Sequence, residues 1–237
     1  MSAWRVRRPV CLLAVALAAG CGAGPQPAPA ASTDPGANTA LFEAAFVPGH
    51  VHDADGRRLV FAPRPVGTFR IVSGRIVACD PFFCEHVAPF DVAAPNGEFP
   101  LVLAVARDAA NGDERVAFAR LAFSQAPVVA WRPARVSGDG EVLGYAVDSG
   151  IGGFMDADAR ADYDAQVQVD AGAVFDRIIA DMDATHAPTR SWRLRTDTRG
   201  SIALFSSGYG DGGYASYWGV DAAGRPVALL TDFQVVE

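Results

Sequence analysis

The sequence predicts an α+β fold that is mostly antiparallel β, arranged as a sandwich or a curved sheet. Short apolar runs, separated by turns rich in Gly, Asn and Asp, fill most of residues 68–233, which is typical of antiparallel strands. One segment, residues 156–183, is instead rich in Ala and Asp, and its second half repeats apolar residues every four positions, as helices do. A helical insertion among strands is typical of the α+β class.

The first strands lie on either side of a turn signal. Residues 68–71 and 75–78 are apolar runs that flank Ser73-Gly74. Gly and Ser favour tight turns between strands. The sequence therefore predicts a β-hairpin here.

One further strand pair and two further strands follow. Residues 99–106 and 115–123 are separated by a loop that contains Asn-Gly, a strong hairpin signal. Residues 128–131 and 142–147 lie on either side of the turn-rich stretch 137–140. We expect each run to form a strand.

The end of the chain, like the preceding strands, consists of apolar runs separated by turns. Three apolar or aromatic runs occupy residues 201–206, 214–220 and 226–233, with Gly-rich or Asp-containing turns at 208–213 and 221–224. Consecutive strands joined by short turns usually pair with each other. The sequence predicts a C-terminal three-strand meander.

The helical insertion is expected around residues 157–183. Asp156 could cap its first helix and Asp170 a second helix, because an Asp side chain accepts backbone N–H groups at a helix start. The second helix carries an apolar stripe. Its members are Val174, Ile178 and Met182, with Phe175 and Ile179 alongside.

The N-terminus has the features of a secretory signal peptide. Its first residues carry three arginines and no acid, and residues 10–19 are almost purely apolar. That run is too short to span a bilayer, which takes about 20 apolar residues. We therefore expect residues 1–20 to be a signal peptide.

The stretch Leu17-Ala18-Ala19-Gly20-Cys21 resembles a bacterial lipobox, although Ala18 stands where Leu is usual. The resemblance implies that Cys21 is lipidated and anchors the protein to the extracytoplasmic side of the cell membrane. Residues 21–40 then form the lipidated Cys and a flexible Pro/Ala/Gly tether, and residues 41–237 a single globular domain. The alternative is an ordinary signal peptide and a secreted protein.

The charge of the chain argues against nucleic-acid binding. Its formal net charge is −7, and removal of the signal peptide with its three arginines makes it −10. Binding to a phosphate backbone depends on clustered Lys and Arg. We expect no nucleic-acid partner.

Two cysteines remain in the mature domain. Cys79 and Cys84 flank a short loop, and disulfides persist in oxidising compartments. They could form a disulfide, remain as two buried thiols, or bind a metal with His86. Zinc usually takes four ligands and no fourth is obvious, so we expect no metal there.

Three stretches together resemble a known family. They are residues 73–81, 144–156 and 206–219, followed by Asp232-Phe233. Their order and content are similar to the bacterial family catalogued as domain of unknown function 4241. The resemblance implies no reaction or cofactor, and it leads us to expect Cys where this chain has Gly153.

Four carboxylates at predicted strand ends are candidate site residues. They are Asp148, Asp156, Asp211 and Asp232. Such groups could converge on a hard divalent cation or act as acid and base. Asp is equally a preferred cap and turn residue, so both interpretations stay open.

The Gly-rich segment 208–213 provides further candidates. Ser206 precedes it without the Gly-x-Ser-x-Gly pattern of a nucleophile elbow. Tyr214 and Trp218 would share one face of a strand, and either face could be core or an aromatic surface for a ligand.

These observations favour a non-enzymatic binding or interaction domain at the cell envelope, which would contact its ligand through the 208–213 loop and the nearby aromatic residues. Its partner could be a protein or a small molecule. The alternative is a metal-assisted hydrolase that uses the four carboxylates.

Overall fold

The computed structural model describes residues 39–137 and 144–236. The predicted signal peptide, Cys21, nearly all of the predicted tether and the start of the predicted strand at 142–147 lie outside these residues. Within the described part of the chain, no helix is both long enough and apolar enough to cross a membrane.

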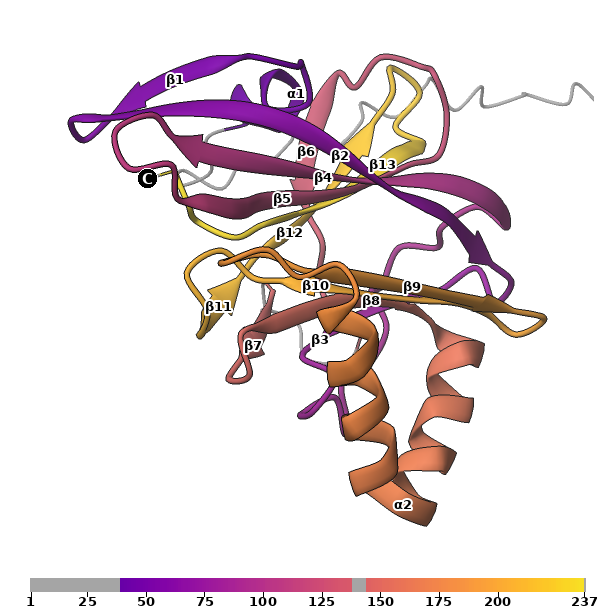
Figure 1. The fold of residues 1–237 in the computed structure, drawn as a ribbon. Helices are drawn as coiled ribbons and strands as arrows, with labels where there is room; N and C mark the ends of the chain where they lie inside the picture. Colours follow the sequence, from indigo (N-terminus) through magenta and orange to yellow (C-terminus); the bar gives the residue numbers. More distant parts are fainter. Residues whose placement is uncertain (1–38, 138–143, 237) are drawn as a thin grey trace, which may run out of the picture. The chain divides into compact units, whose positions relative to one another are not determined.

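Seven antiparallel strands form the larger sheet, which curls into a half-barrel (Figure 1). In spatial order they are β1 (Val51–Ala54), β2 (Arg57–Ile71), β4 (Gly97–Asp108), β5 (Glu114–Ala122), β13 (Pro226–Asp232), β12 (Ser216–Val220) and β6 (Ala130–Pro133). The predicted pairing of residues 99–106 with 115–123 is confirmed by β4 and β5.

Four antiparallel strands form the second sheet. In spatial order they are β3 (Ile76–Cys79), β8 (Ile151–Asp156), β10 (Gly200–Ser206) and β9 (Trp192–Asp197). A short ribbon pairs β7 (Tyr145–Val147) with β11 (Gly212–Tyr214), and a one-turn helix, α1 (Leu41–Ala44), precedes β1. The predicted class, α+β with mostly antiparallel β, is confirmed.

The described domain has three layers, in which the second sheet lies between the larger sheet and the helical insertion (Figure 1). The main core fills the space between the sheets and includes Phe69 and Leu101 from the larger sheet and Phe154 and Phe205 from the second. A smaller core fills the space between the second sheet and the insertion. Both faces of the second sheet are therefore covered.

The helical insertion is α2 (Ala157–Asp183), two helical segments that meet at a kink where Asp170 has non-helical φ −157° and ψ 87°. Asp156 caps the first segment by accepting the backbone N–H of Asp158 at 2.8 Å. Asp170 caps the second by accepting the N–H of Ala173 at 3.0 Å. Both predicted caps are confirmed.

The three main members of the predicted apolar stripe are buried, whereas Ile179 alongside them is 46% exposed. Val174, Ile178 and Met182 pack against Met155 and Leu204 of the second sheet. Burial of such side chains stabilises the fold by about 2 kcal/mol each. The stripe thus holds the insertion on the sheet.

Two predicted strand pairings are wrong. The turn at Ser73-Gly74 does not close a hairpin, because β2 lies in the larger sheet and β3 in the second. The C-terminal meander is also incomplete: β12 and β13 pair with each other, but β10 pairs with β8 and β9. In both cases the connecting turn carries the chain from one sheet to the other, a choice that local turn residues do not encode.

Candidate functional site

Asp156 has a structural role. One carboxylate oxygen accepts hydrogen bonds from the backbone N–H groups of Val72 and Ser73 and from the Ser73 hydroxyl, at 2.7 to 3.0 Å, and the other caps α2. Its side chain is fully buried. These bonds hold the turn between the two sheets and leave Asp156 no free oxygen for a ligand.

The other predicted carboxylates do not gather around it. Asp148 and Asp211 are exposed, and Asp232 accepts the backbone N–H of Gln234 at 2.8 Å. Burial raises the pKa of Asp232 to about 6. Within residues 39–137 and 144–236, no three His, Cys, Asp or Glu side chains are grouped so that they could hold a metal ion. The geometry therefore gives the metal-assisted hydrolase no site at these four residues.

The predicted aromatic surface is mostly core. Tyr214 donates its hydroxyl to the carbonyl of Gly210 at 2.8 Å, and Trp218 is packed among Phe90 and Phe123. Ser206 accepts the backbone N–H of Ser191 at 2.9 Å. These three residues shape the Gly-rich loop and the core.

Tyr209 is the exposed aromatic residue of that loop, with 53% of its surface accessible. The guanidinium carbons of Arg57 and Arg115 lie 5.9 and 5.1 Å from the centre of its ring. Arg57 also donates to the Tyr209 hydroxyl and to the carbonyl of Val235. These contacts fasten the 208–213 loop to the larger sheet.

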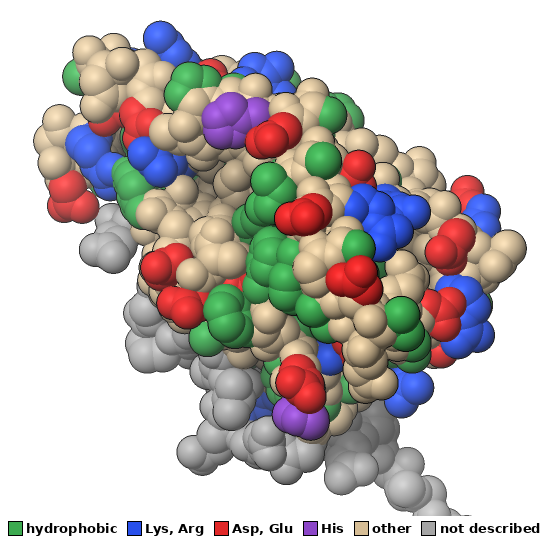
Figure 2. Space-filling model, turned by 60° about the horizontal axis from the view of Figure 1, so that its bottom comes forward, with side chains coloured by type: hydrophobic (Ala, Val, Ile, Leu, Met, Phe, Trp, Pro, Cys, Tyr) green, Lys and Arg blue, Asp and Glu red, His purple; other side chains and the backbone are tan. Residues whose placement is uncertain are grey.

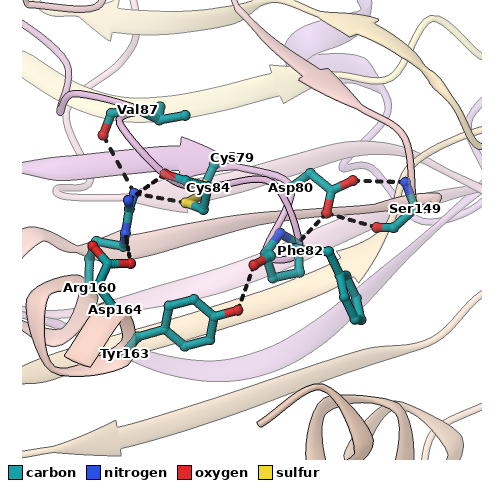
Figure 3. The surroundings of a disulfide bond; sticks show 10 residues. Cys79, Asp80, Phe82, Cys84, Val87, Ser149, Arg160, Tyr163 and Asp164 are labelled. Carbon is teal, nitrogen blue, oxygen red and sulfur yellow. Dashed lines mark hydrogen bonds and ion pairs between the residues drawn. A yellow bond between two sulfur atoms is a disulfide. The ribbon is translucent and has the colours of Figure 1, made fainter. Parts of the chain in front are cut away.

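Of the three possibilities for Cys79 and Cys84, the structure has the disulfide. No thiol of this pair is therefore left for a metal site with His86. Asp80, inside the loop that they close, is almost fully buried. Its carboxylate accepts the N–H groups of Phe82 and Ser149 and the Ser149 hydroxyl, at 2.8 to 2.9 Å (Figure 3). It also accepts the N–H group of Asp148 at 2.9 Å. Asp80 thus joins the disulfide loop to the chain that enters β8.

Two α2 side chains hold the same loop from the other side (Figure 3). Arg160 donates to the sulfur and the carbonyl of Cys84 and pairs with Asp164 at 2.6 Å. Tyr163 donates to the carbonyl of Pro81 at 2.5 Å. A groove of about 280 Å³ adjoins this loop, and three polar side chains of α2 line it. Tyr163 and Asp164 are engaged by Pro81 and Arg160, and Gln168 is exposed.

The most promising cavity lies between α2 and the outer face of β9 and β10. Side chains alternate between the two faces of a strand, so Arg193 and Arg195 of β9 point toward α2, whereas Trp192 and Leu194 point to the main core. Arg177 reaches the same cavity from the second segment of α2. We call this space the arginine cavity.

The arginine cavity is lined by both polar and apolar side chains, and its volume is about 70 Å³. That is room for a few water molecules or one small polar group. The apolar part of the wall is formed by Ala159, Val174, Ile178, Ile202 and Leu204. Tyr163 also lines it, and burial raises the pKa of Tyr163 to about 12.

Arg193 is the buried charge of this cavity. Only 7% of its side chain is exposed, and its Nη2 pairs with Asp181 at 3.1 Å. Its Nε is buried and has no hydrogen-bond partner among the described residues. Burial lowers the pKa of the Arg193 guanidinium, Asp181 counteracts this, and the positive charges of Arg195 and Arg177 lower it further.

The positive charge around the cavity is only partly neutralised. Arg177 and Arg195 are exposed at its mouth and form no ion pair within the described chain. Two carboxylates also line the cavity: Asp162 lies 3.3 Å from the Nε of Arg199, and one oxygen of Asp197 accepts the backbone N–H of Arg199 at 2.7 Å. An anion could therefore be bound there.

The wider surface gives no hint of this site. On the face that α2 occupies, arginine and carboxylate side chains are interspersed around a central group of hydrophobic ones (Figure 2).

The sequence of β9 carries a signal of this site. Residues 192–195 alternate apolar and charged residues, as a strand with one polar face does.

The model of the family described as protein of unknown function DUF4241 matches residues 69–231. The chain belongs to this family. No curated protein and no solved structure matches the chain. The matched range begins in β2 and ends in β13, so this DUF4241 domain includes the disulfide, α2 and the arginine cavity.

Proposed function

We propose that this DUF4241 protein is an exported lipoprotein whose domain binds a small ligand at the cell envelope without transforming it. The arginine cavity carries the proposal, because it holds a buried donor, Arg193 Nε, that has no partner in the described chain. A buried polar group without a partner costs about 1–3 kcal/mol, and a ligand that accepts its hydrogen bond removes that cost.

The absence of a transformed substrate is inferred from the side chains around the cavity. A general acid or base works best with a pKa near the working pH. The polar groups that line the cavity are three arginines, the carboxylates of Asp162 and Asp197, Gln166, and Tyr163 with its raised pKa. This set favours binding over proton transfer.

The proposed location is supported by the sequence of the first 21 residues. Three arginines, an apolar run and Cys21 fit export and lipidation. Two acyl chains are enough for stable membrane anchoring. The Cys79–Cys84 disulfide is compatible with an oxidising compartment.

The location is tested by expressing the full chain and a Cys21→Ser variant in a bacterium fed a radiolabelled fatty acid. We expect the label and the membrane association in the native chain and neither in the variant. Cys11→Ser is the matched control and should leave both unchanged. An unlabelled native chain that keeps its N-terminal Met would overturn the location.

Binding is tested by hydrogen exchange on the membrane-anchored full chain, with and without a small-metabolite extract. We expect slower exchange in α2 and β9, the elements that line the cavity. Protection confined to the 208–213 loop would assign the binding site to the Gly-rich loop instead and contradict the proposed cavity.

A further inference from the structure

We infer that the ligand of the arginine cavity is a small organic carboxylate with a short aliphatic body. This inference rests on the proposed binding function and names its ligand class. The observation that carries it is the convergence of three guanidinium groups, from Arg177, Arg193 and Arg195, on one cavity that also has apolar side chains in its wall.

Arg193 has an incomplete set of hydrogen bonds in the cavity. Arg193 is paired by Asp181 through Nη2 alone, and its Nε remains buried without an acceptor. A guanidinium presents its N–H groups in a planar fork that matches the two oxygens of a carboxylate. A carboxylate at Nε would complete the hydrogen bonding of Arg193 and offset the positive charges of Arg177 and Arg195.

The acceptors already present do not supply this. Asp162 pairs with Arg199, Asp197 accepts a backbone N–H, and Asp181 pairs with Nη2 of Arg193. None of these carboxylates accepts a hydrogen bond from Arg193 Nε. Three arginines line the cavity against two carboxylates, so an anion would gain a charge interaction that a neutral hydrogen-bond acceptor would not. The cavity therefore favours an anion over a neutral molecule.

Size and lining then select the kind of anion. The volume of about 70 Å³ suits one carboxylate group, and Val174, Ile178, Ile202 and Leu204 provide apolar contacts next to it. A short aliphatic chain can bury its methylene groups there. Inorganic phosphate has no apolar part and would gain nothing from this wall.

The test is isothermal titration calorimetry of the full chain in detergent with butyrate and hexanoate, compared with butyramide, hexanol and inorganic phosphate. We expect the carboxylates to bind at least about tenfold more tightly than their neutral counterparts and more tightly than phosphate. We expect hexanoate to bind more tightly than butyrate, because it has two more methylene groups to bury.

Variants localise the binding. Arg177→Gln and Arg195→Gln change exposed side chains that form no ion pair in the described chain, so the fold should tolerate them. Each should weaken hexanoate binding by about five- to tenfold, and the double variant by more. Arg58→Gln, which removes an exposed arginine of the larger sheet, is the matched control and should bind like the native chain.

The outcomes separate the inference from the proposed function. If butyramide or hexanol binds as tightly as the acids and slows hydrogen exchange in α2 and β9, the anion inference is wrong and the binding function stands. If phosphate binds most tightly, the carboxylate class is wrong. If none of these probes binds and the metabolite extract leaves the exchange of α2 and β9 unchanged, both proposals fail.

Discussion

Individual buried carboxylates join separate segments of the described chain through hydrogen bonds, and the sequence predicted these roles only in part. The sequence identified Asp156 as both a helix cap and a candidate site residue, and the structure shows the cap together with three further hydrogen bonds to a turn. Asp80 has a similar role but gave no sequence signal of it. Which turn a carboxylate binds depends on tertiary packing, which one sequence does not reveal.

The sequence analysis also did not predict the residues of the candidate site. Tyr214 and Trp218, near the Gly-rich loop, were predicted as candidate binding residues, yet both are core residues. Arg193 and Arg195 carry the proposed site, and they became interpretable only once β9 was known to face α2.

Asp232 allows a prediction about pH. Its pKa is raised from 3.8 to about 6 by burial, so folding disfavours its charged form. The native chain should therefore lose stability relative to Asp232→Asn as the pH rises from about 4 through 6, while below pH 4 the two should be similar. Asn keeps the acceptor for the Gln234 N–H. Urea unfolding at pH 4, 5, 6 and 7 should show a difference on the order of 2 kcal/mol at pH 7.

Asp148→Asn is the matched control for this experiment. Asp148 is exposed, so its replacement should change the free energy of unfolding by less than about 0.5 kcal/mol at every pH. A native chain whose stability relative to Asp232→Asn is constant over this range would contradict the raised pKa.

At the scale of elements, local signals predicted what is local. The β4–β5 pair, the caps of α2 and its buried stripe all follow from short-range patterns, and all are confirmed. The failures are the partners of β3 and β10. The sheet that a strand joins depends on which apolar faces meet in the core. Turn residues such as Ser73-Gly74 are the same in a hairpin and in a connection between two sheets.

Gly153 of β8 tests the packing of the second sheet. It lies opposite Cys79 in the β3–β8 register, and a Cβ there would approach Leu204 Cδ2 to 2.5 Å and the Ala203 carbonyl oxygen to 2.7 Å. Gly153→Ala should therefore force the neighbouring strand β10 to shift. We expect the free energy of unfolding to fall by about 2 kcal/mol, measured by urea denaturation.

Gly213→Ala is the control for this prediction, because a Cβ at Gly213 meets no atom within 4 Å. It should change the stability by less than about 0.5 kcal/mol. Equal effects of the two substitutions would show that β8 and β10 are less tightly packed than described. The same crowding is a physical reason for Gly at a position where the family resemblance led us to expect Cys.

At the scale of the whole described domain, the second sheet couples two cores. One face of β8 and β10 contributes Phe154 and Phe205 to the main core, and the other contributes Met155 and Leu204 to the core under α2. Because β3, β8 and β10 each contribute side chains to both cores, loss of either core exposes the other. We therefore expect the domain to unfold as one cooperative unit.

The disulfide provides a test of that coupling. It closes a short loop, with a sequence separation of 5 between Cys79 and Cys84, for which loop-closure entropy gives about 2 kcal/mol of stabilisation. For a domain of this size, that corresponds to a fall in Tm of about 4–8 °C on reduction. The fall should occur in one transition that calorimetry and far-UV circular dichroism detect at the same temperature.

Reduction should not release α2 by itself. Arg160 still donates to the Cys84 carbonyl, Tyr163 to the Pro81 carbonyl, and Asp80 keeps its four hydrogen bonds after the sulfur–sulfur bond is broken. The double variant Cys79→Ser/Cys84→Ser should have the Tm of the reduced native chain and should not respond to a reducing agent. Two separate transitions in the reduced chain, with α2 melting first, would show that the smaller core is not coupled to the main one through the second sheet.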